Sequence, residues 1–398
     1  MSRIYADAVV IGGGVIGTAI MYYLSKSGMK PVLVEEKNLN AGASGSCDEG
    51  IILQSKKSGI MLKMVTESAE LYKNLPKELE YDIGYRNVGG MILINEEKYI
   101  PVIKSFVEKQ NEQGLNISML DYKDTHNNQP GLAKNVIASA YNKEDCSVYP
   151  FKLTLGYTKA AQKLGSKFLP HNKVIKLITQ DGKITQVITN EHEIYTPIVI
   201  NAAGYRADII GKMLEIEIPV LPVRGQIIIT EQIPFVIHHQ IMDAKFIVAK
   251  HQPELLDQDS LVSKLNIGLT LSQAPTGNLI IGGCRENASY NTNTSFNTVR
   301  EILKNAVDFF PFFNKISVIR TFAGLRPTVP DNLPILCSTK VSGFYVATGL
   351  GGDGVSLSPI VGKIMSELVV MGKCDIVDMT KLSLDRFKSS CINTSYIL

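Results

Sequence analysis

The chain has 398 residues, of which 45% are hydrophobic and 20% charged, and its formal net charge is +3. This length can bury a large core in two domains or two interleaved lobes. Because the sequence has no long basic run and no aromatic residues interleaved with Lys and Arg, we expect no nucleic-acid partner. The six cysteines form no CxxC motif and the six histidines no HExxH motif, so we predict reduced thiols and no metal site.

The first forty residues have the pattern of strand, glycine-rich turn, helix and second strand. The apolar run 6–11 leads into the GxGxxG turn at 12–17, and apolar residues then recur at helical spacing as far as Gly28. A second apolar run, 31–34, ends at Glu35. Glu35 follows the glycines by roughly the twenty residues expected for an acid that binds a ribose. The pattern predicts a dinucleotide site and leaves FAD and NAD open.

Each part of this pattern has a mechanical role. Gly12 permits a tight turn, Gly14 lets the backbone approach a pyrophosphate, and Gly17 lets the helix pack on the strand. Free N–H groups at the helix N-terminus favour the phosphates. The cofactor contacts expected here are Gly12, Gly14, Val15, Ile16, Gly17, Glu35 and Glu36.

Small residues at 41–47 leave room for a flat cofactor to lie against the backbone. Together, GGGVIG, VLVEEK and GASGSCDEG resemble the FAD-dependent D-amino acid oxidase, glycine oxidase and sarcosine oxidase family. The resemblance implies an α/β (α+β two-lobed) fold, in which a Rossmann-like FAD-binding domain is interleaved with an antiparallel-sheet substrate domain. The resemblance also implies FAD contacts at Ser44, Gly45, Ser46, Gly50 and Ile51.

The middle of the chain should alternate between these two domains. We predict helices at 58–75, 99–121, 154–164 and 298–310, β-structure at 83–94, and a polar loop at 124–134. The resemblance implies an FAD-binding domain of residues 1–84, 146–221 and 320–398, and a substrate-binding domain of residues 85–145 and 222–319. It also places Val174 near the adenine and Gly204 near the FAD.

The PxRGQ segment at 222–226 matches the family's second entry into the substrate domain. Three short strands with a turn at 180–182 precede this segment, and a buried strand at 198–204 ends in small residues. After it we expect strands at 225–230, 244–249, 266–271 and 279–283. The polar stretch 251–264 is a candidate surface loop or lid.

The C-terminal part carries GLRPxxPDxxPI and GFYVATGxGGDG, a pair similar to that which closes amine-oxidising flavoproteins. The resemblance covers residues 9 to about 368. It implies FAD contacts at Gly351, Gly352, Asp353, Gly354 and Val355. A helix N-terminus here would stabilise negative charge on a reduced flavin. Asp353 would oppose that charge unless it faces solvent or a cation.

For the substrate carboxylate we choose Arg326, because a guanidinium grips a carboxylate in two places and orients the substrate. The glycine oxidase branch of the family uses the arginine of this GLRP motif in the same way. A structural ion pair of Arg326 is the competing interpretation, and Arg285 or Arg320 could bind the carboxylate instead. Tyr205 stands where many relatives have tryptophan, which favours packing over catalysis.

Two departures from the family bear on the cofactor and the electron acceptor. The covalent sarcosine oxidases place a cysteine before their PD motif, where this chain has Ala323 and Gly324, so we expect non-covalent FAD. Those enzymes have a lysine at the position of Ser356, and its absence weakens the case for an oxidase. Cys47 could be a reactive thiol beside the flavin, although a packed residue is the better interpretation.

The sequence thus favours an FAD-dependent dehydrogenase acting on a small amino or imino acid such as glycine, sarcosine, proline or D-hydroxyproline. The resemblance is closest to catalytic subunits of (hydroxy)proline, opine and cyanide-forming glycine dehydrogenases, which implies electron-accepting partner subunits. An oxidase that releases peroxide and a non-catalytic flavin subunit are the alternatives. An NAD enzyme is disfavoured by the C-terminal glycine turns. With no signal peptide and no transmembrane segment apparent, we expect a cytoplasmic protein.

Overall fold

The computed structural model describes residues 2–257 and 260–388. Residues 389–398, the end of the predicted FAD-binding segment 320–398, lie outside the described residues. So do Met1, at the start of the segment 1–84, and residues 258–259 of the candidate lid.

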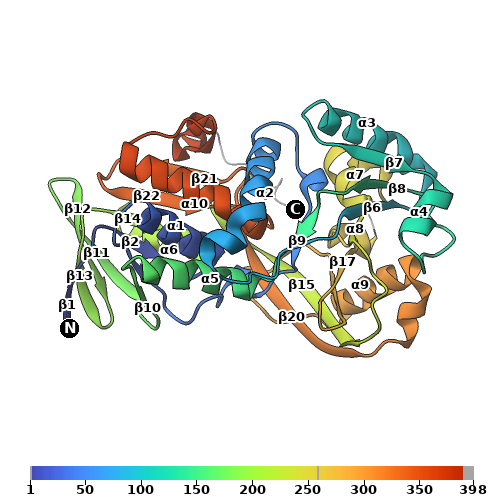
Figure 1. Cartoon of the computed structure of the whole chain (residues 1–398), viewed down its shortest axis with the longest axis horizontal. Helices are drawn as coiled ribbons and strands as arrows, with labels where there is room; N and C mark the ends of the chain where they lie inside the picture. Colours follow the sequence, from blue (N-terminus) through green and yellow to red (C-terminus); the bar gives the residue numbers. More distant parts are fainter. Residues whose placement is uncertain (1, 258–259, 389–398) are drawn as a thin grey trace.

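A six-stranded sheet is the centre of the first lobe (Figure 1). In spatial order its strands are β10 (Lys167–Leu169), β3 (Val32–Val34), β2 (Val9–Ile11), β14 (Val199–Asn201), β22 (Phe344–Thr348) and β21 (Ile335–Ser338). The first five are parallel, and β21 is antiparallel to β22. Every residue of β2, β3 and β14 is buried, as expected for a parallel sheet covered on both faces. This is the Rossmann-like arrangement that the glycine-rich turn predicts.

Helices cover the first lobe, and their apolar faces explain the packing. They are α1 (Val15–Lys26), α2 (Ile60–Leu79), α5 (Pro150–Lys163), α6 (Ala207–Lys212) and α10 (Gly354–Met371). α1 and α10 approach closely because Gly362 has no side chain: a Cβ there would lie 2.6 Å from the ring of Tyr23. The Ser366 hydroxyl donates to the Tyr23 carbonyl at 3.1 Å. Among the described helices, only α10 is long and apolar enough to span a membrane, and 67% of that stretch is buried within the protein.

Two smaller sheets accompany the first lobe. The four-stranded one has the order β1 (Ser2–Tyr5), β13 (His192–Tyr195), β12 (Lys183–Thr189) and β11 (Val174–Gln180). The three-stranded one has the order β4 (Gly50–Ile51), β9 (Cys146–Ser147) and β5 (Arg86–Asn87). The second of these joins segments on either side of the first excursion into the second lobe.

The second lobe is built on a nine-stranded, mostly antiparallel sheet. Its order is β19 (Glu286–Asn287), β15 (Leu221–Gln232), β18 (Asn278–Gly282), β17 (Thr270–Gln273), β16 (Gln240–Asp243), β6 (Gly90–Ile94), β8 (Ala138–Asn142) and β7 (Ile117–Leu120), with β20 (Val318–Thr328) paired to β15. Its helices are α3 (Ile100–Asn111), α4 (Tyr122–Asn128), α7 (Lys245–His251), α8 (Leu261–Lys264) and α9 (Phe296–Phe309). Figure 1 shows β15 and β20 as long strands that run from the middle of the molecule into this lobe.

Short 3-10 helices connect the elements at η1 (Ala43–Gly45), η2 (Leu53–Ser55), η3 (Glu97–Tyr99), η4 (Gly204–Arg206), η5 (Pro253–Leu255), η6 (Pro311–Lys315), η7 (Met379–Leu382) and η8 (Leu384–Phe387). The domain boundaries predicted at 222 and 320 fall inside β15 and β20. The exact division therefore stays a prediction.

Three element predictions were wrong. Residues 244–249 form helix α7 instead of a strand, because a short run that is buried on most sides has no readable period. The helix predicted at 99–121 ends at Asn111 and is followed by strand β7. Part of the loop predicted at 124–134 is helix α4, whose N-cap Asp121 accepts a hydrogen bond from the backbone N–H of Asp124. The predicted helices at 58–75, 154–164 and 298–310 are confirmed as α2, α5 and α9.

Candidate active site

A cavity of about 1760 Å³ is lined by residues of both lobes. It exceeds the ~300–1,000 Å³ of a typical small-molecule site, so it has room for a dinucleotide and a second ligand. The predicted site residues that line it are Gly12, Gly14, Val15, Ile16, Glu35, Glu36, Ser44, Ser46, Gly50, Val174, Gly204, Tyr205, Arg285, Arg326, Gly351, Gly352, Asp353, Gly354 and Val355. Those that do not line it are Gly17, Gly45, Ile51 and Arg320.

The glycine-rich turn has the geometry that its sequence requires. Gly12 has a φ of +114°, and a Cβ there would lie 2.5 Å from the carbonyl oxygen of Ala202. A Cβ at Gly17 would lie 1.9 Å from the carbonyl oxygen of Gly12, so Gly17 serves the packing of α1 on β2. α1 therefore begins at the cavity wall with its free N–H groups directed to the place where a pyrophosphate is expected.

The acids after β3 lie beside this turn. The Glu35 carboxylate accepts from the backbone N–H of Gly13 at 2.7 Å and of Lys37 at 2.8 Å. These two bonds fix its orientation and leave lone pairs for ribose hydroxyls. Glu36 pairs with Arg206 at 2.9 Å.

The run of small residues closes over the start of α1. The Ser44 hydroxyl accepts from the backbone N–H of Val15 at 2.9 Å, and a Cβ at Gly14 would lie 3.0 Å from the same oxygen. Gly45 makes the turn possible, because a Cβ there would lie 2.1 Å from the carbonyl of Asn40. Backbone donors, a fixed acid and a cradle that a Cβ would fill together fit the dinucleotide half of FAD.

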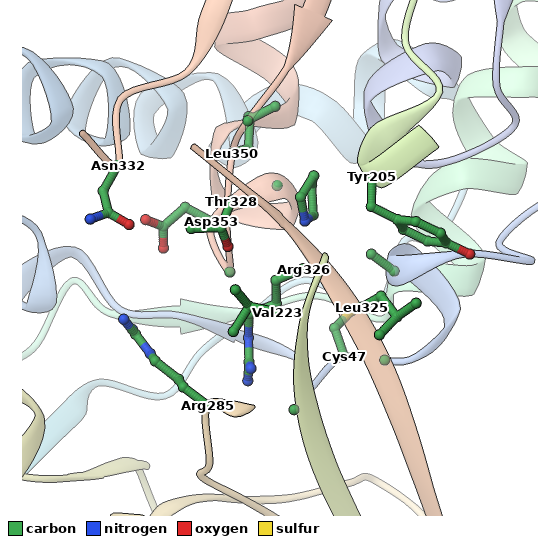
Figure 2. Close-up of a pocket in the computed structure, with 18 of the residues that line it drawn as sticks. Cys47, Tyr205, Val223, Arg285, Leu325, Arg326, Thr328, Asn332, Leu350 and Asp353 are labelled. Atoms are coloured by element: carbon green, nitrogen blue, oxygen red, sulfur yellow. The ribbon is translucent and has the colours of Figure 1, made fainter. Parts of the chain in front are cut away.

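Arg326 lies on β20, in register with Val223 of β15, and Figure 2 shows it in the middle of the cavity wall. Its guanidinium lies over Gly225, where a Cβ would be 2.2 Å from Nη1. Nη1 donates to the carbonyl of Cys284 at 3.0 Å. Within the described chain no ion pair involves Arg326, so the structural ion pair weighed above is not formed. Its remaining N–H groups are left for a ligand.

Asp353, at the start of α10, faces a cation, which is one of the two alternatives that the sequence left open. Its carboxylate lies 2.6 Å from the ammonium of Lys56, which follows η2. Burial raises the pKa of Asp353, but the ammonium of Lys56, together with the charges of Lys250 and Arg285, outweighs burial and holds that pKa below its usual value. The acid is therefore ionised and neutralised, and the positive end of α10 stays available to a bound anion.

Two further groups line the cavity near Arg326. Burial raises the pKa of the Asp48 carboxyl, and the nearby Arg326 guanidinium opposes that shift. Burial also raises the pKa of the Cys47 thiol. Cys47 is thus a protonated thiol, which agrees with the packed residue that the sequence favours.

The remaining candidate site residues, Arg320 and Tyr205, differ in whether they line the cavity. Arg320 lies on β20 away from the cavity, with its guanidinium 5.7 Å from the ring of Phe322. Tyr205 lines the cavity on the opposite side from Arg285 and Asp353 in Figure 2. Sequence reasoning missed Lys56 and Lys250. Neither belongs to a motif, and Lys250 directly follows the run 244–249 that was wrongly predicted as a strand.

Comparisons with known proteins identify the family of this chain. Residues 7–368 match the family model described as "DAO: FAD dependent oxidoreductase". The hydrogen cyanide synthase subunit HcnC of Pseudomonas aeruginosa is 25% identical over 412 residues, with 93% of each chain covered. Mitochondrial dimethylglycine dehydrogenase of Mus musculus is 24% identical over 96% of this chain, which spans only 44% of that protein's length. The crystal structure of L-proline dehydrogenase from P. horikoshii superposes with a TM-score of 0.87 at 25% identity, covering 97% of this chain and 98% of that one.

Proposed function

This chain belongs to the DAO family of FAD-dependent oxidoreductases, and from that premise we propose that it oxidises the C–N bond of a small amino or imino acid. Bound FAD supplies the hydride acceptor for this reaction. We propose that the FAD is held without a covalent bond, since the thiol of Cys47 is protonated and Cys337 lies outside the cavity lining. The substrates of this type are glycine, sarcosine, proline and D-hydroxyproline.

The observation that carries the proposal is the free guanidinium of Arg326 at the cavity wall. A carboxylate bound by two of its N–H groups would have its α-carbon fixed in one orientation. The absence of a side chain at Gly225 leaves the space that the guanidinium occupies. The Cys284 carbonyl then holds one guanidinium nitrogen in place.

The N-terminal end of α10 contributes the second part of the mechanism. Its backbone N–H groups and helix dipole favour negative charge in the adjoining part of the cavity. Because Lys56 neutralises Asp353, the acid at the helix start does not cancel that effect. The protein can thereby stabilise negative charge through backbone N–H groups and the helix dipole alone.

We further propose that electrons leave through partner subunits or another acceptor, and that the protein is cytoplasmic. The name of HcnC as a synthase subunit supports a multi-subunit assembly for this chain. A buried serine, Ser356, stands where the oxidase relatives noted above have lysine. Slow reoxidation of reduced protein in air would support the dehydrogenase, and rapid reoxidation would favour an oxidase.

The test is an anaerobic visible spectrum of the FAD-loaded protein before and after adding glycine, sarcosine, L- and D-proline and D-hydroxyproline in turn. We expect one of these or a related amino acid to bleach the flavin band. Arg326→Met should keep FAD but raise the dissociation constant of that amino acid by roughly 30-fold or more, the equivalent of at least ~2 kcal/mol for a buried charge partner. A flavin that no amino acid reduces would refute the proposal.

A further inference from the structure

The cavity wall carries two cations that the proposed reaction does not use. Lys250 lies near the end of α7, and Arg285 lies between β18 and β19, with its backbone N–H donating to the carbonyl of Leu265 at 2.9 Å. Both side chains line the cavity. Within the described part of the chain, no acid forms an ion pair with either of them.

The acids close to these cations are already engaged. Asp353 is the acid that acts on both, and its carboxylate is paired with Lys56 at 2.6 Å. The Asp48 carboxyl lies under the influence of Arg326. The local balance is therefore positive even before Lys57, which also lines the cavity, is counted.

This excess charge lies on the cavity wall, where Arg285 is half-buried and Lys250 is exposed to the cavity. Partial desolvation by the surrounding cavity wall, followed by repulsion from Arg285, lowers the pKa of Lys250 to about 8. Burial and repulsion from Arg326 lower the pKa of Arg285 to about 10. Like charges gathered this closely repel one another, and a bound anion would relieve that repulsion.

The anion is not the pyrophosphate of the cofactor. The pyrophosphate is expected at the N-terminus of α1, on the first lobe, whereas α7 and the β18–β19 segment belong to the second lobe. Figure 2 shows Arg285 beside Arg326, which is where the substrate carboxylate is expected.

We propose that Lys250 and Arg285 form a second anion subsite, so that the substrate is an amino or imino acid with a second anionic group, a carboxylate or a phosphate, on its side chain or nitrogen substituent. The inference rests on the proposed function, because Arg326 must take the carboxylate next to the reacting carbon. An ammonium with a guanidinium suits either kind of distal anion.

The experiment compares amino acids that differ only in the distal charge. Anaerobic flavin reduction of the FAD-loaded protein is titrated with aspartate and asparagine, glutamate and glutamine, and O-phosphoserine and serine, each as both enantiomers. We expect at least one dianion to bind at least tenfold more tightly than its neutral partner. The aspartate and glutamate pairs report a distal carboxylate, and the phosphoserine pair reports a phosphate.

Two variants assign that preference to the proposed residues. Lys250→Met and Arg285→Met should each reduce the ratio of dianion to neutral affinity at least fivefold. Lys104→Met is the matched control: it removes the same charge from an exposed position on α3 outside the cavity lining and should leave the ratio unchanged. FAD content and the visible spectrum confirm that each variant is folded.

The outcomes separate the two proposals. If neutral amino acids reduce the flavin as well as the dianions do, or if the variants leave the ratio unchanged, the second anion subsite is wrong and amino-acid oxidation stands. If Arg285→Met weakens the neutral and charged members equally, Arg285 shares the first carboxylate with Arg326 and the subsite is also wrong. If no amino acid of either kind reduces the flavin, both proposals fail.

Discussion

Gly225→Ala tests how the active site holds its arginine. An added Cβ would lie 2.2, 2.4 and 2.5 Å from Nη1, Nη2 and Cζ of Arg326. Ordinary contacts between such atoms are about 3.5 Å, so the guanidinium must move by roughly 1 Å or more. That movement breaks or lengthens its 3.0 Å hydrogen bond to the carbonyl of Cys284.

The expected effect is large on substrate and small on the fold. A misplacement of about 1 Å in a positioning group costs roughly 100-fold in rate or affinity. The strand itself should tolerate alanine, because the clash is with the far end of a flexible side chain and the backbone is not involved. Anaerobic stopped-flow reduction gives the substrate dissociation constant and the reduction rate separately, and FAD content reports folding.

The control is a double-mutant cycle with Arg326→Met. If Gly225→Ala acts only by displacing the guanidinium, it should change little once the guanidinium is gone, and the two effects should be strongly non-additive. Additive losses, or a Gly225→Ala enzyme with normal substrate affinity, would refute this reasoning.

Three further changes test the cofactor site, its charge balance and a buried acid. Gly12→Ala should weaken FAD binding by roughly 10- to 100-fold, because the new Cβ would lie 2.5 Å from the Ala202 carbonyl oxygen and alanine is strained at a φ of +114°. Flavin-fluorescence titration of the apoprotein measures the FAD dissociation constant. Lys56→Met should lower the free energy of unfolding in urea by about 1–3 kcal/mol, because the Asp353 carboxylate loses its partner. Adding Asp353→Asn to this variant should recover part of that loss. Burial raises the pKa of Asp145 to about 7 from 3.8, so the native state binds more protons than the unfolded chain between these values. The unfolding free energy of the wild-type protein minus that of Asp145→Asn should therefore fall as pH rises from about 4 to 7, by up to roughly 4 kcal/mol, and a difference that does not change with pH would contradict this prediction.

The first lobe could be predicted because its motifs are local. The spacing of Gly12, Gly14 and Gly17 carries a backbone requirement that the structure meets at each position. The amphipathic pattern of residues 298–310 likewise corresponds to α9, whose buried and exposed positions alternate at helical spacing. In both cases the information lies within a few residues of the feature.

The second lobe was harder because its pairing is non-local. The run 244–249 is mostly apolar, so it has no period that separates a strand from a helix, and in the structure it lies in α7 with Phe246, Ile247 and Val248 buried. Lys250 follows this run in the same helix, and the direction of its side chain depends on that helix. Arg285 and Arg320 were both proposed as site residues, and nothing in the sequence around them showed which one lines the cavity. The structure places Arg285 in the cavity lining and Arg320 outside it.

The pairing of Lys56 with Asp353 is a contact that the sequence alone could not predict. The sequence predicts that the acid at the start of α10 faces either solvent or a cation, and the cation that it meets is 297 residues away in the chain. Which of the many lysines reaches Asp353 is decided by the packing of η2 against the end of the cavity. Since Lys56 pairs with this acid, neither Lys250 nor Arg285 forms an ion pair with it among the described residues. The anion subsite that we propose for the substrate therefore depends on a contact that only the folded chain reveals.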